Sequence, residues 1–500
     1  MGALGECCLG GKPGCHGMEQ MLLVGGEEEE IRLGPELECG GGIEDAVKVL
    51  LEGLGEDPDR DGLKKTPLRV AKALRDGTRG YKQSVHDIVE GALFLEAGMS
   101  NRVDRARGGG GLVVVRDIGL FSYCESCLLP FRVQCHVGYI PSGQHVVGLS
   151  KLARVADVFA KRLQDPQRLA DDICSALQSS IKPLGVAVSL QCWHIHLPEL
   201  GRKNPCQRHT SSRSNMQGWH ELDVCSYSGI FEDEGGDPWI EFAAVLKFGG
   251  VNVGRVEEEK EKEKPSPLQN WCPLKSPEMV QCIGKASSKL VGTLPDAMVA
   301  AVTSILTSLG EDPLREELVG TPQRFVRWLM TFRRASFELK LNSNFHLGQL
   351  GLYSAKNSGG DIIGSRSKGE IVHSELSLPF CSQCEHHLLP FYGVAHIGYL
   401  APPESKIIDR SLLHSVVLFY GCKLQVQERL TRQITETVFS IFCGGVMVVV
   451  EADHVCMVSR GIEKMGSSTA TTAAMGQFAA NLEAKTMFLQ TIACSRAAGG

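Results

Sequence analysis

The sequence contains no run of apolar residues long enough to span a bilayer, so no membrane-embedded segment is expected. The N-terminal residues lack the basic, apolar and small-residue segments of a secretory signal, and they are not rich in arginine like a transit peptide. Positive charge is not in excess either, because 52 Lys and Arg face 58 Asp and Glu, for a formal net charge of −6. This balance argues against binding nucleic acid through bulk charge, although a local basic cluster can still bind phosphates. We expect a cytoplasmic protein whose partners include neither membranes nor nucleic acids.

Cysteine, by contrast, is abundant. Nineteen cysteines are scattered along the chain, many of them inside apolar stretches. Because no secretory signal is found, they are expected to be reduced thiols and metal ligands rather than a framework of disulfides.

An internal repeat covers most of the 500 residues. Apolar residues recur at helical spacing from Ile43 and again from Met298, and each run is followed by a Thr-Pro pair, at Thr66 and Thr321. Threonine is predicted to cap the helix that follows, with proline in its first turn. Strand-like segments rich in Val and further helices come next in each copy. This pattern predicts two α+β units in tandem.

The repeat divides the chain into four segments. Residues 1–42 are rich in Gly and Glu without periodicity and are predicted to be disordered. Residues 43–250 and 285–495 are the two similar units, and residues 251–284 are the linker between them. The charged run Glu257–Lys264 in this linker is expected to be solvated rather than functional.

The second unit carries a dense group of metal-binding residue types. Cys384 and His387 stand three residues apart, a spacing that fits one turn of chain around a metal, and Cys456 at the end of a Val-rich strand supplies a third ligand. A catalytic zinc takes three protein ligands and leaves one position for water. His386 and His454 then remain beside the metal as imidazoles for proton transfer at neutral pH.

Other interpretations of this group remain open. Cys381 and Cys384 form a C-x-x-C pair, which by itself is typical of a closed structural zinc site in an interaction module. His373 and Glu375, followed by Pro379 and this pair, imitate the signature of zinc deaminases. That signature has Pro directly before its first Cys and lies on two helices, whereas an extra residue intervenes here and the context is strand and loop.

The second unit contains a series of further motifs: Cys384-Glu385-His386-His387, His396-Ile397-Gly398-Tyr399, Gln425 to Thr431, His454 to Gly461, Ser467 to Thr472 and Gly476-Gln477-Phe478. With these motifs the chain resembles a known family, GTP cyclohydrolase I, in the tandem two-unit form of plants, over roughly residues 43–250 and 285–495. The resemblance implies T-fold units, each an antiparallel sheet with helices on one face, assembling into barrel-type homo-oligomers of at least two chains. It also implies hydrolysis of GTP to formate and 7,8-dihydroneopterin triphosphate, the first step of pterin and tetrahydrofolate biosynthesis.

The resemblance assigns a role to each residue of the second-unit site. Zinc would be bound by Cys384, His387 and Cys456. Protons would be transferred by His386 and His454. The guanine edge would be recognised by Gln427 and Glu428.

Triphosphate binding is divided differently between the units. The Gly-Leu-Ser-Lys-x-x-Arg motif of the family is intact in the first unit, whereas the second unit has Leu412 and Ser415 in place of its two cations. The residues implied in triphosphate binding are Arg69, Lys72, Ser150, Lys151, Arg154 and Arg460.

The first unit lacks other parts of the site. Ser126 replaces the catalytic histidine, and Cys127 and His196 exchange the metal-ligand types, so that Cys124, Cys127 and His196 can form a structural zinc shell. Neither unit therefore has a whole site, and we expect active sites to be completed between the two unit types across an interface. The alternative function is a non-catalytic regulatory scaffold that binds pterin or nucleotide. The complete reactive set in the second unit favours an enzyme.

Overall fold

The structure is a computed structural model. It describes residues 42–95, 111–142, 145–195, 219–233, 235–251, 271–275, 295–342, 371–401, 407–442, 444–460 and 468–499. The segment predicted to be disordered lies outside these residues except for Gly42, and so does the charged run Glu257–Lys264. We call residues 42–251 the first half, residues 271–275 the connector and residues 295–499 the second half. Among the described residues, no helix is both long and apolar enough to cross a membrane.

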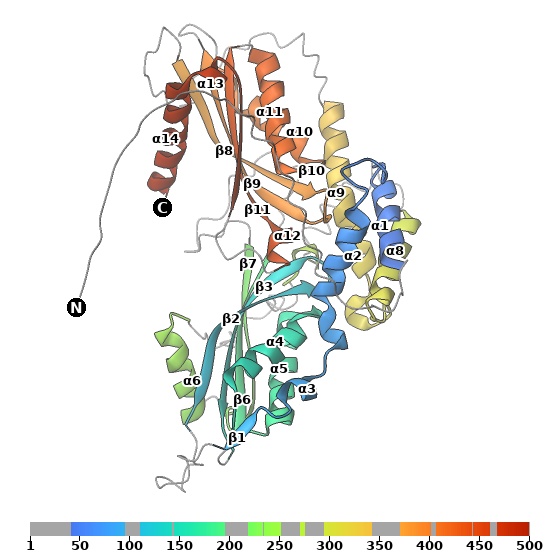
Figure 1. Cartoon of the computed structure of the whole chain (residues 1–500), viewed down its shortest axis with the longest axis vertical. Helices are drawn as coiled ribbons and strands as arrows, with labels where there is room; N and C mark the ends of the chain where they lie inside the picture. The colour runs from blue at the N-terminus through green and yellow to red at the C-terminus, as the bar shows by residue number, and fades with distance from the viewer. Residues whose placement is uncertain are drawn as a thin grey trace, which may run out of the picture. The chain divides into compact units, whose positions relative to one another are not determined.

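The first half consists of a helical start and a five-stranded sheet with its helices (Figure 1). Its helices are α1 (Gly42–Gly53), α2 (Thr66–Gly77), η1 (Arg79–Lys82), α3 (Val85–Val89), α4 (Leu149–Ala160), α5 (Pro166–Ile181) and α6 (Asp237–Phe248). Its strands are β1 (Leu93–Leu95), β2 (Val113–Cys124), β3 (Pro130–Ile140), β4 (His145–Val147), β5 (Leu163–Gln164), β6 (Gly185–Ile195) and β7 (Trp219–Gly229). The connector contains η4 (Pro273–Lys275).

The second half repeats this order. Its helices are α8 (Asp296–Ser308), η5 (Glu316–Leu318), α9 (Thr321–Asn342), α10 (Arg410–Gly421), α11 (Gln427–Phe442), α12 (Val455–Val458), α13 (Gln477–Ala480) and α14 (Leu482–Gly499). Its strands are β8 (Ile371–Cys384), β9 (Pro390–Ala401), β10 (Leu424–Gln425), β11 (Gly445–His454) and β12 (Thr469–Gly476).

The two large sheets have the same topology. Their strand orders are β5-β2-β3-β6-β7 and β10-β8-β9-β11-β12, antiparallel except for the two-residue parallel pairing at one edge of each. The irregularities recur as well. Asp117 interrupts the pairing of β2 with β3, Ser377 interrupts the pairing of β8 with β9 at the corresponding place, and both residues have a φ near +60°. The prediction of two repeated α+β units with the T-fold arrangement is confirmed.

Each sheet packs apolar side chains on both of its faces. Side chains alternate along a strand, and Val113 and Val115 belong to the main core with α4 and α5, whereas Val114 packs with Phe242 of α6. The second sheet does the same, with α10 and α11 on one face and α13 and α14 on the other (Figure 1). The resemblance anticipated the helices on one face, and the last helices of each half add a second, smaller core on the other.

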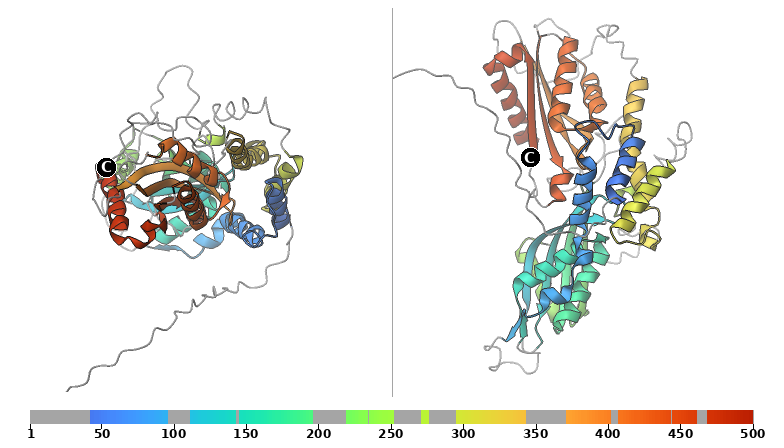
Figure 2. Two further views of the ribbon diagram at one scale, coloured as in Figure 1. Left: turned by 90° about the horizontal axis from the view of Figure 1, so that it is seen from above. Right: turned by 45° about the vertical axis from the view of Figure 1, so that its right-hand side comes forward.

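The helical starts of the two halves pack against the opposite half. Helices α1 and α8 lie side by side (Figure 2). The Thr66 hydroxyl donates to the carbonyl of Glu385 at 2.7 Å, and the Thr321 hydroxyl donates to the carbonyl of Glu125 at 2.7 Å. The prediction that Thr66 caps its own helix was wrong, because Lys65 occupies the cap position and the hydroxyl bonds to the other half instead.

The connector is part of the core. Trp271, Cys272 and Leu274 are all buried in the main hydrophobic cluster. The predicted linker 251–284 therefore includes a segment that is packed rather than solvated, because its apolar side chains find a place against the first half.

Candidate active site

The second-half site is built on a tight turn that follows β8. The amide of Cys384 donates to the carbonyl of Leu389 at 2.9 Å, the amide of Leu388 donates back to Cys384 at 2.9 Å, and Leu388 has a φ of 53°. This turn places the side chains of Cys384 and His387 together. Cys456 joins them from α12, directly after the end of β11, and the ligand atoms of the three residues all lie within 4.8 Å of one another.

The donor set and its environment fit a metal ion. Hydrogen bonds from Cys456, and from the neighbouring histidines, hold the pKa of the Cys384 thiol well below its ordinary value although burial opposes this shift. The Nδ1 atom of His387 is buried and has no hydrogen-bond partner within the described structure. A thiolate, a second cysteine and an orphaned imidazole nitrogen are the ligand types that zinc prefers.

His454 is fixed in place by Gln427 rather than left open. The amide nitrogen of Gln427 donates to the carbonyls of Val450 at 3.0 Å and Thr469 at 2.9 Å, so its oxygen faces the ring. Because that oxygen can only accept, Nε2 of His454 is the donor across 2.7 Å. The ring also stacks on Phe391 with 4.7 Å between centroids. Gln427 is 2% exposed, and these contacts engage both ends of its amide, which differs from the expected contact with guanine.

The side chains of His386 and Glu428 are accessible to a bound ligand. His386 is half-buried next to Cys384, and Glu428 is exposed in the first turn of α11. Arg432, four residues further along α11, could pair with Glu428, but it pairs with Glu436 at 3.6 Å instead. Within the described residues no ion pair involves Glu428.

The alternative metal and deaminase interpretations do not fit this geometry. Cys381 is buried, but it is not among the residues grouped around Cys384. His373 and Glu375 lie on strand β8, where His373 stacks on Tyr399 and Glu375 pairs with Arg410, so they are not on a deaminase-like helix.

The first half contacts the turn of the second-half site through the start of α2, where Thr66 bonds to the carbonyl of Glu385. Arg60, which precedes α2, pairs with the buried carboxylate of Glu385 at 3.0 Å, and Arg429 of α11 pairs with the same carboxylate. Glu385 lies between the ligand Cys384 and His386. Arg69 and Lys72 are exposed on α2, one and two turns beyond Thr66. Two of the predicted phosphate-binding residues are therefore on an element that touches the metal-binding turn.

The remaining predicted phosphate-binding residues lie in two places. Arg460 is exposed and its Nε donates to the carbonyl of Cys456 at 3.0 Å, directly beside the metal ligands. Ser150, Lys151 and Arg154 are on α4, where the Lys151 ammonium donates to the carbonyl of Ile88 at 2.7 Å. In the part of the chain that the structure describes, every hydrogen bond and ion pair of α4 stays within the first half.

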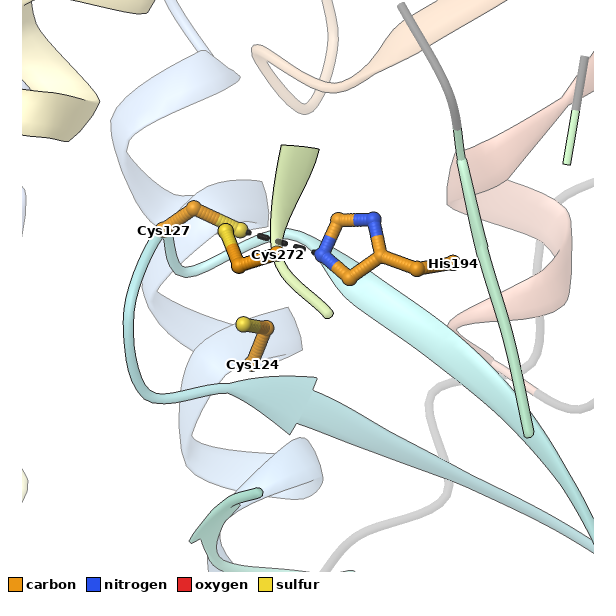
Figure 3. A group of neighbouring side chains, drawn as sticks. All are labelled: Cys124, Cys127, His194 and Cys272. Atoms are coloured by element: carbon orange, nitrogen blue, oxygen red, sulfur yellow. Dashed lines mark hydrogen bonds between the residues drawn. The ribbon is translucent and has the colours of Figure 1, made fainter. Parts of the chain in front are cut away.

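A second buried cluster is formed by the first half together with the connector (Figure 3). It contains Cys124 and Cys127, as expected, together with His194 and Cys272. His196, the ligand that the sequence suggested, lies outside the described residues. Cys272 was missed because no motif surrounds it, although the apolar segment from Trp271 to Leu274 stands out in a charged linker.

Comparison with known proteins agrees with this division into halves. The family model for GTP cyclohydrolase I matches residues 43–224 and 298–493. GTP cyclohydrolase 1 of Solanum lycopersicum is 55% identical over 457 residues, which are 91% of this chain and 93% of that protein. The protein of the same name from Arabidopsis thaliana is 51% identical over 500 residues, 98% of this chain and 97% of that protein. That of Dictyostelium discoideum is 48% identical over 163 residues, 33% of this chain and 65% of that protein. The chain therefore belongs to the GTP cyclohydrolase I family.

Proposed function

We propose that this chain hydrolyses GTP to formate and 7,8-dihydroneopterin triphosphate, the entry to tetrahydrofolate synthesis, at the second-half site. The observation that carries the proposal is the convergence of Cys384, His387 and Cys456, with His386 and His454 beside them. Family membership supports the same reaction. A regulatory scaffold would have no need for proton-transfer groups next to a three-ligand metal shell with an open position.

The metal shell and the two further histidines would divide the chemistry. A zinc ion held by Cys384, His387 and Cys456 would supply the Lewis acidity that makes water a nucleophile toward C8 of guanine at neutral pH. His386 is half-buried, so it can exchange protons with both the substrate and solvent. Protonation of guanine N7 makes C8 more electrophilic, and this is a task for His386 or His454. Gln427 positions His454, because its hydrogen bond fixes which ring nitrogen carries the proton.

Recognition of guanine is assigned to Glu428. Its exposed carboxylate, at the start of α11, would accept hydrogen bonds from N1–H and the exocyclic amine of guanine. Its neighbour Gln427 would contribute by holding His454 rather than by touching the base.

The triphosphate would be bound by cations from both halves. Arg460 lies beside the metal ligands, and Arg69 and Lys72 are on the helix that docks at the metal-binding turn. Ser150, Lys151 and Arg154 are on α4, and among the described residues none of them has a hydrogen bond or ion pair with the second half. We therefore propose that they serve the site of a second copy, which makes the active form a homo-oligomer of at least two chains.

The proposal is tested with the full-length chain by measuring formate release from GTP together with the fluorescent pterin formed after oxidation of the product. The chain is expected to produce both in equal amounts, and a metal chelator should abolish both. His386→Ala should reduce kcat by about 100-fold or more, as expected for loss of a general acid. His86→Ala, which removes an exposed histidine of the first half, is the matched control and should turn over normally. Binding of GTP without formate release by the unaltered, zinc-loaded chain would support the scaffold instead.

A further inference from the structure

We propose that Cys124, Cys127, His194 and Cys272 form a second, closed metal site that takes zinc and fastens the connector to the first half. The cluster brings together three separate parts of the chain: the turn after β2, the end of β6 and the connector (Figure 3). This site is independent of the second-half site and of the reaction proposed there.

The geometry is that of a four-coordinate site. One ligand atom from each residue lies within 4.8 Å of every other, and all four residues are 0–1% exposed. Zinc bonds of about 2.3 Å to sulfur and about 2.0 Å to nitrogen place tetrahedral ligand atoms roughly 3.5–4 Å apart, so the cluster is the right size for the ion. Three cysteines and one histidine are also a donor set that closed zinc sites use.

The ring of His194 is already oriented as a ligand. Its Nδ1 lies 3.0 Å from the carbonyl of Ile195, and because a carbonyl only accepts, Nδ1 carries the proton. The bare Nε2 of the neutral ring then points at the sulfur of Cys127, 3.3 Å away. Anchoring of the remote nitrogen by a backbone carbonyl is the usual support for a metal-binding histidine. The ring forms a T-shaped pair with the buried Trp271, with 5.5 Å between centroids.

Positively charged side chains near the cluster favour a zinc complex of net negative charge. Three thiolates and one zinc ion carry a net charge of −1, and two cations face them. Arg324 from α9 of the second half donates to the carbonyl of Ser126 at 2.7 Å, and Lys275 of the connector is in the same short helical turn as Cys272, whose carbonyl accepts a hydrogen bond from the amide of Lys275 at 2.9 Å. Without a metal, this arrangement would bury three thiols that have few good partners in an apolar core.

Four protein ligands leave no position for water, so the site is structural rather than catalytic. Ser126 stands where the second half has His386, which removes the proton-transfer group as well. Coordination by Cys272 closes a loop of 272 − 194 = 78 residues from His194 and holds the connector in the core. Arg324 of α9 contacts the same turn. By fixing this turn, the metal would also fix the surface on which α9 of the second half packs.

Metal analysis of the purified full-length chain tests this inference. The unaltered chain is expected to contain two zinc ions. Cys384→Ser should retain one, and X-ray absorption of that variant should show three sulfur neighbours at about 2.3 Å and one nitrogen at about 2.0 Å. Cobalt-loaded Cys384→Ser should likewise show the visible bands of a tetrahedral site with several thiolates.

Cys272→Ser isolates the new assignment from general damage. It should lose one zinc ion, and the peptide around Trp271 should lose its protection from hydrogen exchange. Cys174→Ser, which alters a buried cysteine of the first half outside the cluster, should keep both ions. Loss of the ion of the second half would instead abolish GTP turnover, so the two sites report separately. A chain with only one zinc ion, or a Cys272→Ser variant that keeps two, would overturn the inference.

Discussion

The amide of Gln427 and the carboxylate of Glu428 are adjacent in the sequence but face different tasks. Gln427 is buried against His454, Val450 and Thr469, whereas Glu428 is exposed at the start of α11. Adjacent residues at a helix start project about 100° apart, so one can point into the protein while the other points to a ligand. The two roles can be separated by kinetics.

We expect Gln427→Ala to lower kcat by about 10- to 100-fold, the range found when a supporting hydrogen-bond partner is removed, with little change in KM for GTP. Glu428→Ala should lower kcat/KM for GTP by a similar factor, because the loss is in recognition. Inosine triphosphate, which lacks the exocyclic amine, separates the two. Gln427→Ala should still prefer GTP over this analogue, and Glu428→Ala should not. If Gln427→Ala lost the preference for GTP, the result would instead support the direct contact of Gln427 with guanine that the sequence suggested.

Single residues also show where sequence reasoning stops. The spacing of Cys384, His387 and Cys456 was enough to predict their convergence, because a turn and the end of a neighbouring strand bring them together. Only part of the first-half cluster could be predicted, since His194 and His196 offer the same ligand type two residues apart in the sequence. Cys272 comes from a distant segment, and packing of Trp271 against Phe131 decides its position. No local pattern encodes that contact.

At the scale of elements, the helical starts are exchanged between the halves. Thr66 of α2 bonds to the turn at Glu385, and Thr321 of α9 bonds to the turn at Glu125. The acidic side chains of these turns are held in the same reciprocal way, since Arg60 pairs with Glu385 and Arg315 lies 3.5 Å from Glu125. Each of these two turns, at 384–389 and at 124–129, is therefore supported by the other half.

Matched substitutions can show this exchange. Thr66→Val removes one buried hydrogen bond, worth about 1 kcal/mol, so amide exchange should quicken roughly fivefold in the turn 384–389 and stay unchanged in the turn 124–129. Thr321→Val should do the reverse. Each variant is the control for the other, and the measurement is hydrogen exchange followed by mass spectrometry. If each substitution loosened the turn of its own half, the exchanged contacts would be contradicted.

The positions of most strands and helices were predictable because their apolar periodicity repeats in both units. The exchange of the helical starts between the halves could not be predicted. The hydrophobic pattern of α1 and α2 indicates that these helices need a partner surface, but it does not indicate which half provides that surface. Two similar units offer two such surfaces, and only the tertiary contacts distinguish them.

At the scale of the whole molecule, both sheets end in open edges in the part of the chain that the structure describes. Within the described residues β12 pairs only with β11, and β8 pairs with β10 through just two residues at its end. In the first sheet, the described strands show the same edges: β7 pairs only with β6, and β2 pairs with β5 through just two residues. Long unpaired edges are sites for adding a strand of another chain. This agrees with the proposal that α4 of one copy serves the second-half site of another.

Mixed oligomers give a direct test of that arrangement. Lys151→Ala should be inactive because a triphosphate loses a charge-assisted contact, and His386→Ala should be inactive because a proton-transfer group is lost. Co-expression of the two variants should restore activity, since a second half from one chain can meet α4 from the other. With random pairing of equal amounts, about a quarter of the sites would be intact. Co-expression of Lys151→Ala with Arg154→Ala, both altered on α4, is the control and should stay inactive. If each chain completed its own site, the first mixture would be as inactive as its parents, because no chain in it carries both intact residues.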